Sequence, residues 1–425
     1  MNKTAVVGLG ISGVATIRWL HERGTEVVAL DTRAQPPGLA ELPAGVPCRC
    51  GPLDEELLKD CQQIVLSPGL SLKTPAIAAA MAAGVEVIGD VELFARHARA
   101  PVIAITGSNG KSTVTSLVGE MARAAGVKVA VGGNIGVPVL ALPEDAELYV
   151  LELSSFQLET THSLHCRAAT LLNLSPDHLD RYQGMADYRD AKLRIFKGCE
   201  TAVYNRDDLA TRPPRGGTSF GLDVPEAGQY GIRDGHLAKG ERLLLPVSEL
   251  RILGRHNQAN TLAALALGEA AGLPLDAMLA ALKGYQGLPH RCEWVADRGG
   301  VTWVNDSKAT NLGSTEAALD GFAGHDGQIL LLAGGDAKGA DLSPLAGRLD
   351  KVRRLIAFGK DGAALAALTD KAELVDSLDA AVALAARLAK PGDLVLLSPA
   401  CASLDQFKSF EARGQRFREL VEALP

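Results

Sequence analysis

Short apolar runs rich in Val, Ile and Leu alternate along the chain with longer segments rich in Ala and Leu that follow a helical period. This alternation is typical of repeated β-α-β units, in which a helix crosses over between neighbouring strands of a parallel sheet. We therefore predict an α/β fold built on mostly parallel sheets. The predicted strands are residues 5–7, 26–30, 63–66, 102–105, 148–153, 170–174, 301–305, 329–333, 355–358 and 394–397.

Two polar links that contain proline divide this alternation into three parts. The first link, residues 97–101, precedes a new strand, and the second, residues 287–291, follows a long helical region. We predict domains at residues 1–94, 95–288 and 289–425. Within the second domain, residues 212–254 carry frequent Gly and Pro and predict a small antiparallel addition.

The charge balance and the cysteines exclude several classes of protein. The 43 Lys and Arg against 50 Asp and Glu give a net charge of −7 without a basic block, so neither nucleic acid nor a membrane surface is an expected partner. Seven cysteines without a C-x-x-C pair indicate neither a disulfide framework nor a zinc site, and favour a reducing cytoplasm. No segment is apolar and long enough to span a bilayer, and the start of the chain shows no export signal.

A glycine motif follows the first predicted strand. Gly8-Leu-Gly10-Ile-Ser-Gly13 opens a helical segment, and Asp31 closes the second strand, as in sites where a backbone approaches a pyrophosphate at a helix N-terminus. By itself this motif favours NAD or FAD, with another nucleotide or simple close packing as alternatives. The turn Ser67-Pro68-Gly69 either adds backbone donors to the same site or is an ordinary β-turn.

A second glycine loop follows the strand at residues 102–105. Gly107-Ser-Asn-Gly-Lys-Ser-Thr113 places backbone N–H groups, one lysine and a hydroxyl where phosphates and Mg²⁺ would lie. Ile105 stands where the usual P-loop pattern has its first glycine, which makes a GTPase or an ordinary P-loop kinase a poorer match. We predict ATP binding here, and the alternative is a glycine-rich turn without a ligand.

Further polar residues follow other strands. Glu152 ends a strand and is the predicted carboxylate ligand of Mg²⁺, although a solvated or helix-capping role is open. Asp177 and His178 share one loop after the next strand. Asn257 and Asn260 stand three residues apart, where they would either read an adenine edge or cap a helix.

Two lysines after strands of the third domain, Lys308 and Lys338, suggest an anionic substrate. In contrast, Ala191-Lys192-Leu-Arg194 by pattern alone predicts an exposed basic face of a helix.

Taken together, these motifs resemble those of the Mur ligases of peptidoglycan assembly. The resemblance extends over essentially the whole chain and is weakest at residues 212–254. It rests on the glycine loop at 107–113, Glu152-Leu-Ser-Ser155, His256-Asn-Gln-Ala-Asn260, His290-Arg291 and Asn305-Asp-Ser-Lys308. Gly132-Gly-Asn-Ile-Gly136, Leu153-Ser-Ser-Phe-Gln157 and the long run 397–407 are similar to the family member that adds D-glutamate.

The resemblance implies an ATP-dependent amide ligase in the cytoplasm that works through an acyl phosphate. Its substrates are implied to be UDP-N-acetylmuramoyl-L-alanine and D-glutamate, and its products include ADP and phosphate. The first and third domains are implied to be Rossmann-like and the second to be a P-loop-type ATPase domain. The N-terminal glycines then hold UDP rather than NAD. A monomer is expected.

The resemblance also implies the roles of individual residues. The UDP-sugar would contact Ile11, Ser12, Asp31, Thr32, Arg33, Ser67, Pro68, Gly69, Asn134 and Ser154. ATP would contact Ser108, Asn109, Gly110, Lys111, Ser112, Thr113, Asn257, Asn260, Arg291 and Asp306. D-glutamate would contact Thr310, Lys338, Ser403 and Phe410.

Two Mg²⁺ ions are implied, with Ser112, Glu152, His178 and Lys192 as ligands. Because an ammonium cannot bind Mg²⁺, Lys192 is implied to carry a CO₂-derived carbamate. The catalytic residues would be Lys111, Asn134, His178, Lys192 and Lys308. The alternatives are another amide ligase of the same superfamily, a nucleotide sensor without catalysis, and an NAD-dependent dehydrogenase, which leaves the P-loop unexplained.

Overall fold

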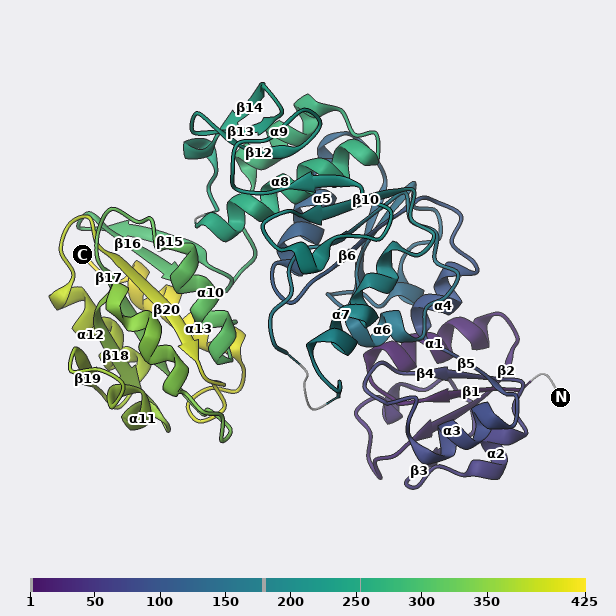
Figure 1. The fold of residues 1–425 in the computed structure, drawn as a ribbon. Helices are drawn as coiled ribbons and strands as arrows, with labels where there is room; N and C mark the ends of the chain where they lie inside the picture. Colours follow the sequence, from purple (N-terminus) through teal and green to yellow (C-terminus); the bar gives the residue numbers. More distant parts are fainter. Residues whose placement is uncertain (1–2, 178–180, 253) are drawn as a thin grey trace. The chain divides into compact units, whose positions relative to one another are not determined.

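The computed structural model describes residues 3–177, 181–252 and 254–425 (Figure 1). It contains two compact units. One comprises Met1–Phe220 and Ala263–Met278, and the other comprises Gly221–Leu262 and Leu279–Pro425. Each unit is built from sheets covered by helices, which confirms the predicted α/β class.

The first sheet of the first unit has the order β3-β2-β1-β4-β5, and all of its pairs are parallel. Its strands are β1 Lys3–Val7, β2 Glu26–Asp31, β3 Cys48–Cys50, β4 Gln63–Leu66 and β5 Glu86–Ile88. Its helices are α1 Ile11–Glu22, α2 Glu55–Lys59, α3 Pro75–Ala82 and α4 Asp90–Ala95. The three strands predicted here are confirmed. The sequence reasoning missed β3 and β5, which are edge strands of only three residues each.

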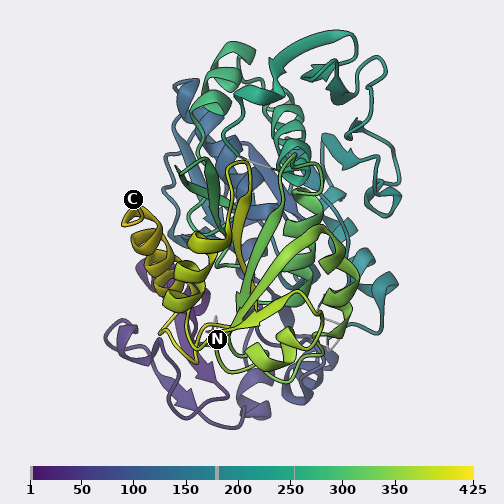
Figure 2. The ribbon, with the colours of Figure 1, turned by 90° about the vertical axis from the view of Figure 1, so that its left-hand side faces the viewer.

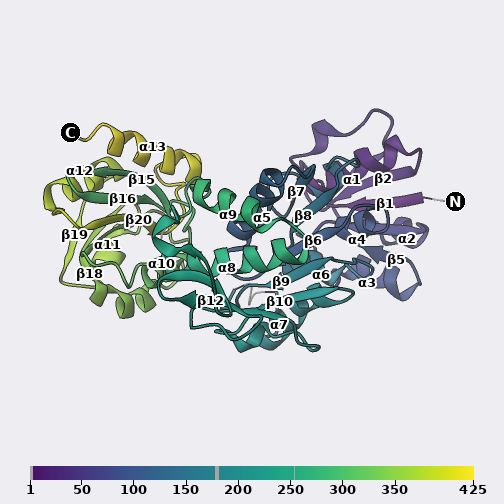
Figure 3. The same ribbon diagram turned by 90° about the horizontal axis from the view of Figure 1, so that it is seen from above.

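A second parallel set of strands in this unit has the order β11-β10-β9-β6-β8-β7, and Figure 3 shows β8, β6, β9 and β10 side by side. The strands are β6 Val102–Thr106, β7 Val129–Gly133, β8 Leu148–Glu152, β9 Ala168–Leu171, β10 Thr201–Asn205 and β11 Thr218–Phe220. The helices are α5 Lys111–Ala124, α6 Ser155–Glu159 and α7 Met185–Leu193. The strand predicted at residues 170–174 begins and ends earlier than expected, so Asn173 belongs to the loop beyond it.

The second unit contains the antiparallel addition that the sequence predicted. Strands β12 Tyr230–Arg233, β13 His236–Lys239 and β14 Arg242–Pro246 pair as an antiparallel meander. Helices α8 Arg255–Ala270 and α9 Leu275–Gly284 follow.

The C-terminal sheet has the order β15-β16-β20-β17-β18-β19, and only the β15–β16 pair is antiparallel. The strands are β15 Glu293–Arg298, β16 Val301–Asn305, β17 Ile329–Gly334, β18 Val352–Phe358, β19 Ala372–Leu374 and β20 Leu394–Ala400. The helices are α10 Leu312–Gly321, α11 Gly362–Ala366, α12 Leu378–Leu388 and α13 Phe410–Glu422. Apolar side chains of α12 and α13 pack on one face, and those of α10 and α11 pack on the other. Figure 2 shows the strands of this sheet with helices beside them. No helix in the described parts of the chain is long and apolar enough to cross a membrane.

The turn between β1 and α1 depends on a close approach that only glycine permits. A Cβ atom added to Gly13 would lie 1.8 Å from the carbonyl oxygen of Gly8, whereas one added to Gly10 would meet nothing within 4 Å. Gly13 therefore lets the helix start against the strand end, as expected of the third glycine of such a motif.

We predict that Gly13→Ala lowers the free energy of unfolding by about 1–3 kcal/mol, because the methyl group overpacks this turn. Gly10→Ala is the matched control and should unfold within about 0.5 kcal/mol of the wild type. Urea unfolding followed by circular dichroism measures both. Equal stability of the two variants would contradict the prediction.

Candidate functional site

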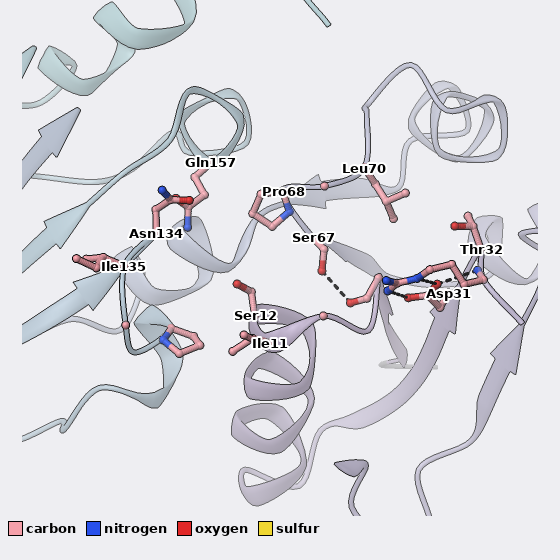
Figure 4. A pocket seen from close by; sticks show the side chains of 17 residues that line it. Ile11, Ser12, Asp31, Thr32, Ser67, Pro68, Leu70, Asn134, Ile135 and Gln157 are labelled. Carbon is pink, nitrogen blue, oxygen red and sulfur yellow. Dashed lines mark hydrogen bonds and ion pairs between the residues drawn. The ribbon is translucent and has the colours of Figure 1, made fainter. Parts of the chain in front are cut away.

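A cavity of about 660 Å³ lies in the first unit, at the carboxyl ends of β1, β2, β4 and β7 (Figure 4). Side chains after β1 and β4 face Asn134, Ile135 and Gln157 across it. Nine of the ten residues predicted to hold the UDP-sugar line this cavity: Ile11, Ser12, Asp31, Thr32, Arg33, Ser67, Pro68, Gly69 and Asn134. The structure therefore gathers residues that are more than 120 positions apart in the sequence, and their binding roles stay predictions.

Ser154, the tenth residue, does not line the cavity. Its hydroxyl accepts a hydrogen bond from the backbone N–H of Gln157 at 3.2 Å, and the Gln157 side-chain oxygen accepts one from the Ser154 backbone N–H at 3.1 Å. This capping box starts α6. Gln157 itself lines the cavity and was missed, as were Leu70, Ile135 and Pro138. The sequence signals were the run 132–136, which contains Ile135, and the run 153–157, which contains Gln157.

Asp31 binds both the backbone of the first glycine turn and the side chain of Arg33. Its buried carboxylate accepts hydrogen bonds from the backbone N–H of Leu9 at 2.6 Å and from the Arg33 guanidinium at 2.7 and 2.9 Å. These bonds, above all those from Arg33, lower the pKa of Asp31 to about 2. Both carboxylate oxygens are thus engaged by the protein, and Asp31 fixes the orientation of Arg33 at the cavity.

The second glycine loop connects β6 to α5 and is braced from the neighbouring strand. Gly110 precedes the helix in the left-handed region at φ +82°, which favours glycine. The Asn173 side chain accepts a hydrogen bond from the Asn109 backbone N–H at 2.8 Å and donates one to the Asn109 carbonyl at 3.0 Å. The Lys111 ammonium donates to the carbonyls of Gly107 and Ser108 at 2.9 and 3.0 Å.

Lys192 lies against the same loop, so the exposed basic face that the charge pattern predicted is wrong at this position. The side chain is only 2% exposed, and its Nζ donates to the Gly107 carbonyl at 3.0 Å and to the Thr106 hydroxyl at 3.3 Å. Burial, together with the positive charge of Lys111, lowers the pKa of Lys192 to about 7. Near neutral pH a substantial fraction of this amine is therefore uncharged.

Two of the predicted metal ligands, Glu152 and Ser112, have surroundings that fit Mg²⁺. Glu152 is 3% exposed at the end of β8, which rules out a solvated role. Its Oε1 accepts a hydrogen bond from the Asn134 side chain at 2.8 Å, whereas its Oε2 is buried and has no hydrogen-bond partner among the residues that the structure describes. An orphaned carboxylate oxygen, with the buried hydroxyl of Ser112 on the first turn of α5, suits a hard cation that keeps several waters and phosphate ligands.

The described residues contain no larger cluster of metal-ligating side chains. No group of three or more His, Cys, Asp or Glu in residues 3–177, 181–252 and 254–425 could hold a metal ion. His178 lies outside the described residues.

The remaining candidates lie in the second unit. Asn257 and Asn260 are buried on one face of α8, and the Asn260 amide donates to the Asn257 side chain at 3.1 Å. Asp306 is buried after β16, and its carboxylate accepts hydrogen bonds from the Ser398 hydroxyl at 2.8 Å and the Cys292 backbone N–H at 3.1 Å. Burial raises the pKa of Asp306 to about 7. Arg291 is half-buried just before Cys292, and its charge counters part of that rise.

The predicted D-glutamate residues lie on loops after β16, β17 and β20 and at the start of α13. Their exposure differs, because Ser403 is buried, Thr310 and Phe410 are half-buried and Lys338 is exposed. The Lys308 ammonium lies 3.8 Å above the centre of the Phe410 ring. The carboxyl ends of parallel neighbours meet at one edge of a sheet, which brings these loops together.

The sequence reasoning missed the residue that joins these loops. Arg413 on α13 is 1% exposed, and its guanidinium donates to the carbonyls of Ser307, Gly334 and Cys401 at 2.9, 3.3 and 3.1 Å. Arg413 is one of three arginines in a helix rich in charged residues, and nothing in the sequence sets it apart from the other two.

Comparisons with known proteins point to one family over nearly the whole chain. Models of three families match consecutive segments: "Mur ligase MurD-like, N-terminal domain" at residues 2–89, "Mur ligase middle domain" at 105–268 and "Mur ligase, glutamate ligase domain" at 290–401. Proteins named UDP-N-acetylmuramoylalanine–D-glutamate ligase are similar throughout. The one from Shewanella oneidensis is 53% identical, covering 99% of this chain and 98% of the relative, and the one from Pseudomonas aeruginosa is 54% identical, covering 99% and 97%.

Solved structures share the fold at low sequence identity. A pseudomurein peptide ligase type C from Methanothermus fervidus superposes with a TM-score of 0.61 at 17% identity, and covers 99% of each chain. A UDP-N-acetylmuramate-alanine ligase from Thermotoga maritima has the same TM-score at 19% identity and the same coverage.

The depressed pKa of Lys192 predicts a pH-dependent stability. Between the folded value near 7 and the unfolded value near 10.5, the unfolded chain binds one more proton than the folded chain. Raising the pH through this window should therefore stabilise the wild type by up to about 1.4 kcal/mol per pH unit relative to Lys192→Met. Urea unfolding in CO₂-free buffers at pH 7 to 10 measures this difference.

The exposed Lys197 supplies the control, because Lys197→Met should keep the pH dependence of the wild type. Parallel stability curves for the wild type and Lys192→Met would show that Lys192 does not titrate in this window.

Proposed function

This chain belongs to the Mur ligase family, and from that premise we propose that it adds D-glutamate to UDP-N-acetylmuramoyl-L-alanine with hydrolysis of ATP to ADP and phosphate. The observation that carries the proposal is the identity of 53–54% over nearly the full length of relatives named for this reaction. We place the reaction in cytoplasmic peptidoglycan precursor synthesis, in a monomer with domains at residues 1–94, 95–288 and 289–425.

The N-terminal cavity takes the UDP-sugar in this proposal. Its volume of about 660 Å³ is in the range of small-molecule sites, and the N-terminus of α1 at its edge favours an anionic diphosphate. Arg33, held by Asp31, adds a cation beside it. Asn134 lines the cavity and also contacts Glu152, so it links the sugar site to the predicted metal site.

In this proposal the glycine loop at residues 107–113 takes the phosphates of ATP, and the further residues that hold the nucleotide are Asn257, Asn260, Arg291 and Asp306. An oxygen of the substrate carboxylate attacks the γ-phosphorus, the bond from that phosphorus to the β-phosphate oxygen breaks, and ADP leaves. Lys111 and Asn134 donate to oxygens on which charge grows in the transition state, which is where oriented donors have their largest effect.

The second step forms the amide. The D-glutamate amine, held with its carboxylates near Thr310, Lys338, Ser403 and Phe410, attacks the acyl carbon, phosphate leaves, and the amine loses its proton. His178 is the proposed base only where its ring does not ligate Mg²⁺, and Lys308 donates to the oxyanion of the tetrahedral intermediate.

The charges around the glycine loop fit the bound Mg²⁺ and the Lys192 carbamate that the proposal requires. Ser112 and Glu152 would hold one Mg²⁺, and His178 and Lys192 a second, where bound Mg²⁺ offsets the charge of the transferring phosphoryl group. The buried Lys192 amine, with a pKa near 7 and the Lys111 cation beside it, suits carbamate formation. Its lone pair attacks CO₂, and the proton it loses goes to solvent.

We predict that phosphate release from ATP requires both the UDP-muramoyl substrate and D-glutamate, since an acyl phosphate without its amine acceptor stalls after one turnover. L-glutamate should substitute poorly, because inversion at the α-carbon moves either the amine or a carboxylate away from its partner. A coupled phosphate assay measures the four combinations. Equal steady turnover with both enantiomers would refute the substrate assignment.

We also predict that Lys192→Ala loses nearly all activity, and that acetate restores part of it by placing carboxylate oxygens in the vacated space. Lys192→Arg should gain nothing from acetate, because its side chain fills that space and keeps a positive charge. Initial rates with and without acetate at constant ionic strength measure this. Lys197→Ala, altered at an exposed lysine, should keep wild-type activity without acetate.

A further inference from the structure

Arg181 connects the turn of the UDP-sugar cavity to the segment that precedes α7. Its guanidinium donates to the carbonyls of Pro68 and Leu70 at 2.9 and 3.1 Å, on either side of Gly69. Pro68, Gly69 and Leu70 all line the cavity. The Arg181 side chain, from the segment before α7, thus holds the backbone of the turn that follows β4 in the first sheet.

The guanidinium is itself held by α6. It forms an ion pair with Glu159 at 3.0 Å and lies 4.0 Å above the centre of the Phe156 ring, and only 16% of the arginine side chain is exposed. The neighbouring Tyr182 hydroxyl donates to the other Glu159 oxygen at 2.5 Å. A lysine could supply the charge here but not the planar fork that reaches two carbonyls and a carboxylate at once.

Aromatic contacts continue from this point to the glycine loop. The Tyr182 ring lies 5.3 Å from the ring of Tyr188 on α7. The Tyr188 hydroxyl lies 3.3 Å from the Ser108 hydroxyl, and its ring lies 4.8 Å below the Lys192 ammonium. Packed side chains therefore join the turn at residues 67–70 to two residues of the predicted phosphoryl-transfer site.

We propose that Arg181 is a positioning residue that couples occupancy of the UDP-sugar cavity to the arrangement of the glycine loop and Lys192. The inference rests on the proposed function. A ligand that binds the turn at residues 67–70 fixes the carbonyls that Arg181 holds, and through Glu159 and Tyr182 it favours one arrangement of α7. By linkage, a nucleotide on the glycine loop then strengthens UDP-sugar binding by the same factor.

The test measures this coupling directly. Calorimetry gives the Kd of UDP-N-acetylmuramoyl-L-alanine with and without Mg²⁺ and a non-hydrolysable ATP analogue. In the wild type we expect the nucleotide to tighten binding about fivefold or more, and in Arg181→Met the factor should fall to within about twofold of one. Arg189→Met, altered at an exposed arginine of α7, should keep the wild-type factor.

Arg181→Lys guards against a folding defect, since it keeps the charge beside Glu159. It should melt near the wild-type temperature and still lose most of the coupling. A wild type without coupling, or an Arg181→Met or Arg181→Lys variant that keeps it, overturns the inference. The proposed function fails separately, if the wild type releases no phosphate that depends on D-glutamate.

Discussion

Two lysine ammonium groups donate to one backbone carbonyl, that of Gly107, and the arrangement of the central site depends on this contact. Lys111 reaches it from the first turn of α5 and Lys192 from the end of α7, at 2.9 and 3.0 Å. Two like charges this close, one of them buried, are unfavourable unless one is neutral or an anion lies nearby. Burial lowers the pKa of Lys192, and the positive charge of Lys111 lowers it further. Phosphates and a carbamate would meet the same electrostatic demand in the working enzyme.

The location of every candidate site follows from the parallel sheets. Parallel strands all have their carboxyl ends at the same edge of the sheet. The helices pack on the two faces of the sheet, so the loops beyond this edge are free of that packing. The N-terminal cavity lies beyond β1, β2, β4 and β7, the glycine loop beyond β6, and Asp306 beyond β16. Chemistry is therefore assembled from residues that are distant in sequence but adjacent at a sheet edge.

One buried arginine, Arg413, and one half-buried arginine, Arg181, join these loops, and their partners explain how a charge is tolerated there. Arg413 binds three carbonyls beyond three strands, and Arg181 binds two carbonyls and one carboxylate. Carbonyl oxygens cannot neutralise a cation as a carboxylate does, and burial accordingly lowers the pKa of Arg413 to about 10. The planar guanidinium suits such positions because it carries five donors in fixed directions.

The sequence by itself determined the features that depend on a few neighbouring residues. Runs of apolar and β-branched residues predicted the strands at 63–66 and 301–305 with the bounds that the structure has. The glycine loops could be recognised because Gly8 and Gly110 adopt positive φ angles, which favour glycine. Only the tertiary structure decided the rest. The edge strands β3 and β19 exist because a neighbouring strand supplies their hydrogen bonds, and Ser154 caps α6 instead of lining the cavity. Burial of Lys192, Asp306, Arg181 and Arg413 also depends on segments far away in the chain, because a side chain's exposure and pKa are set by whatever packs around it.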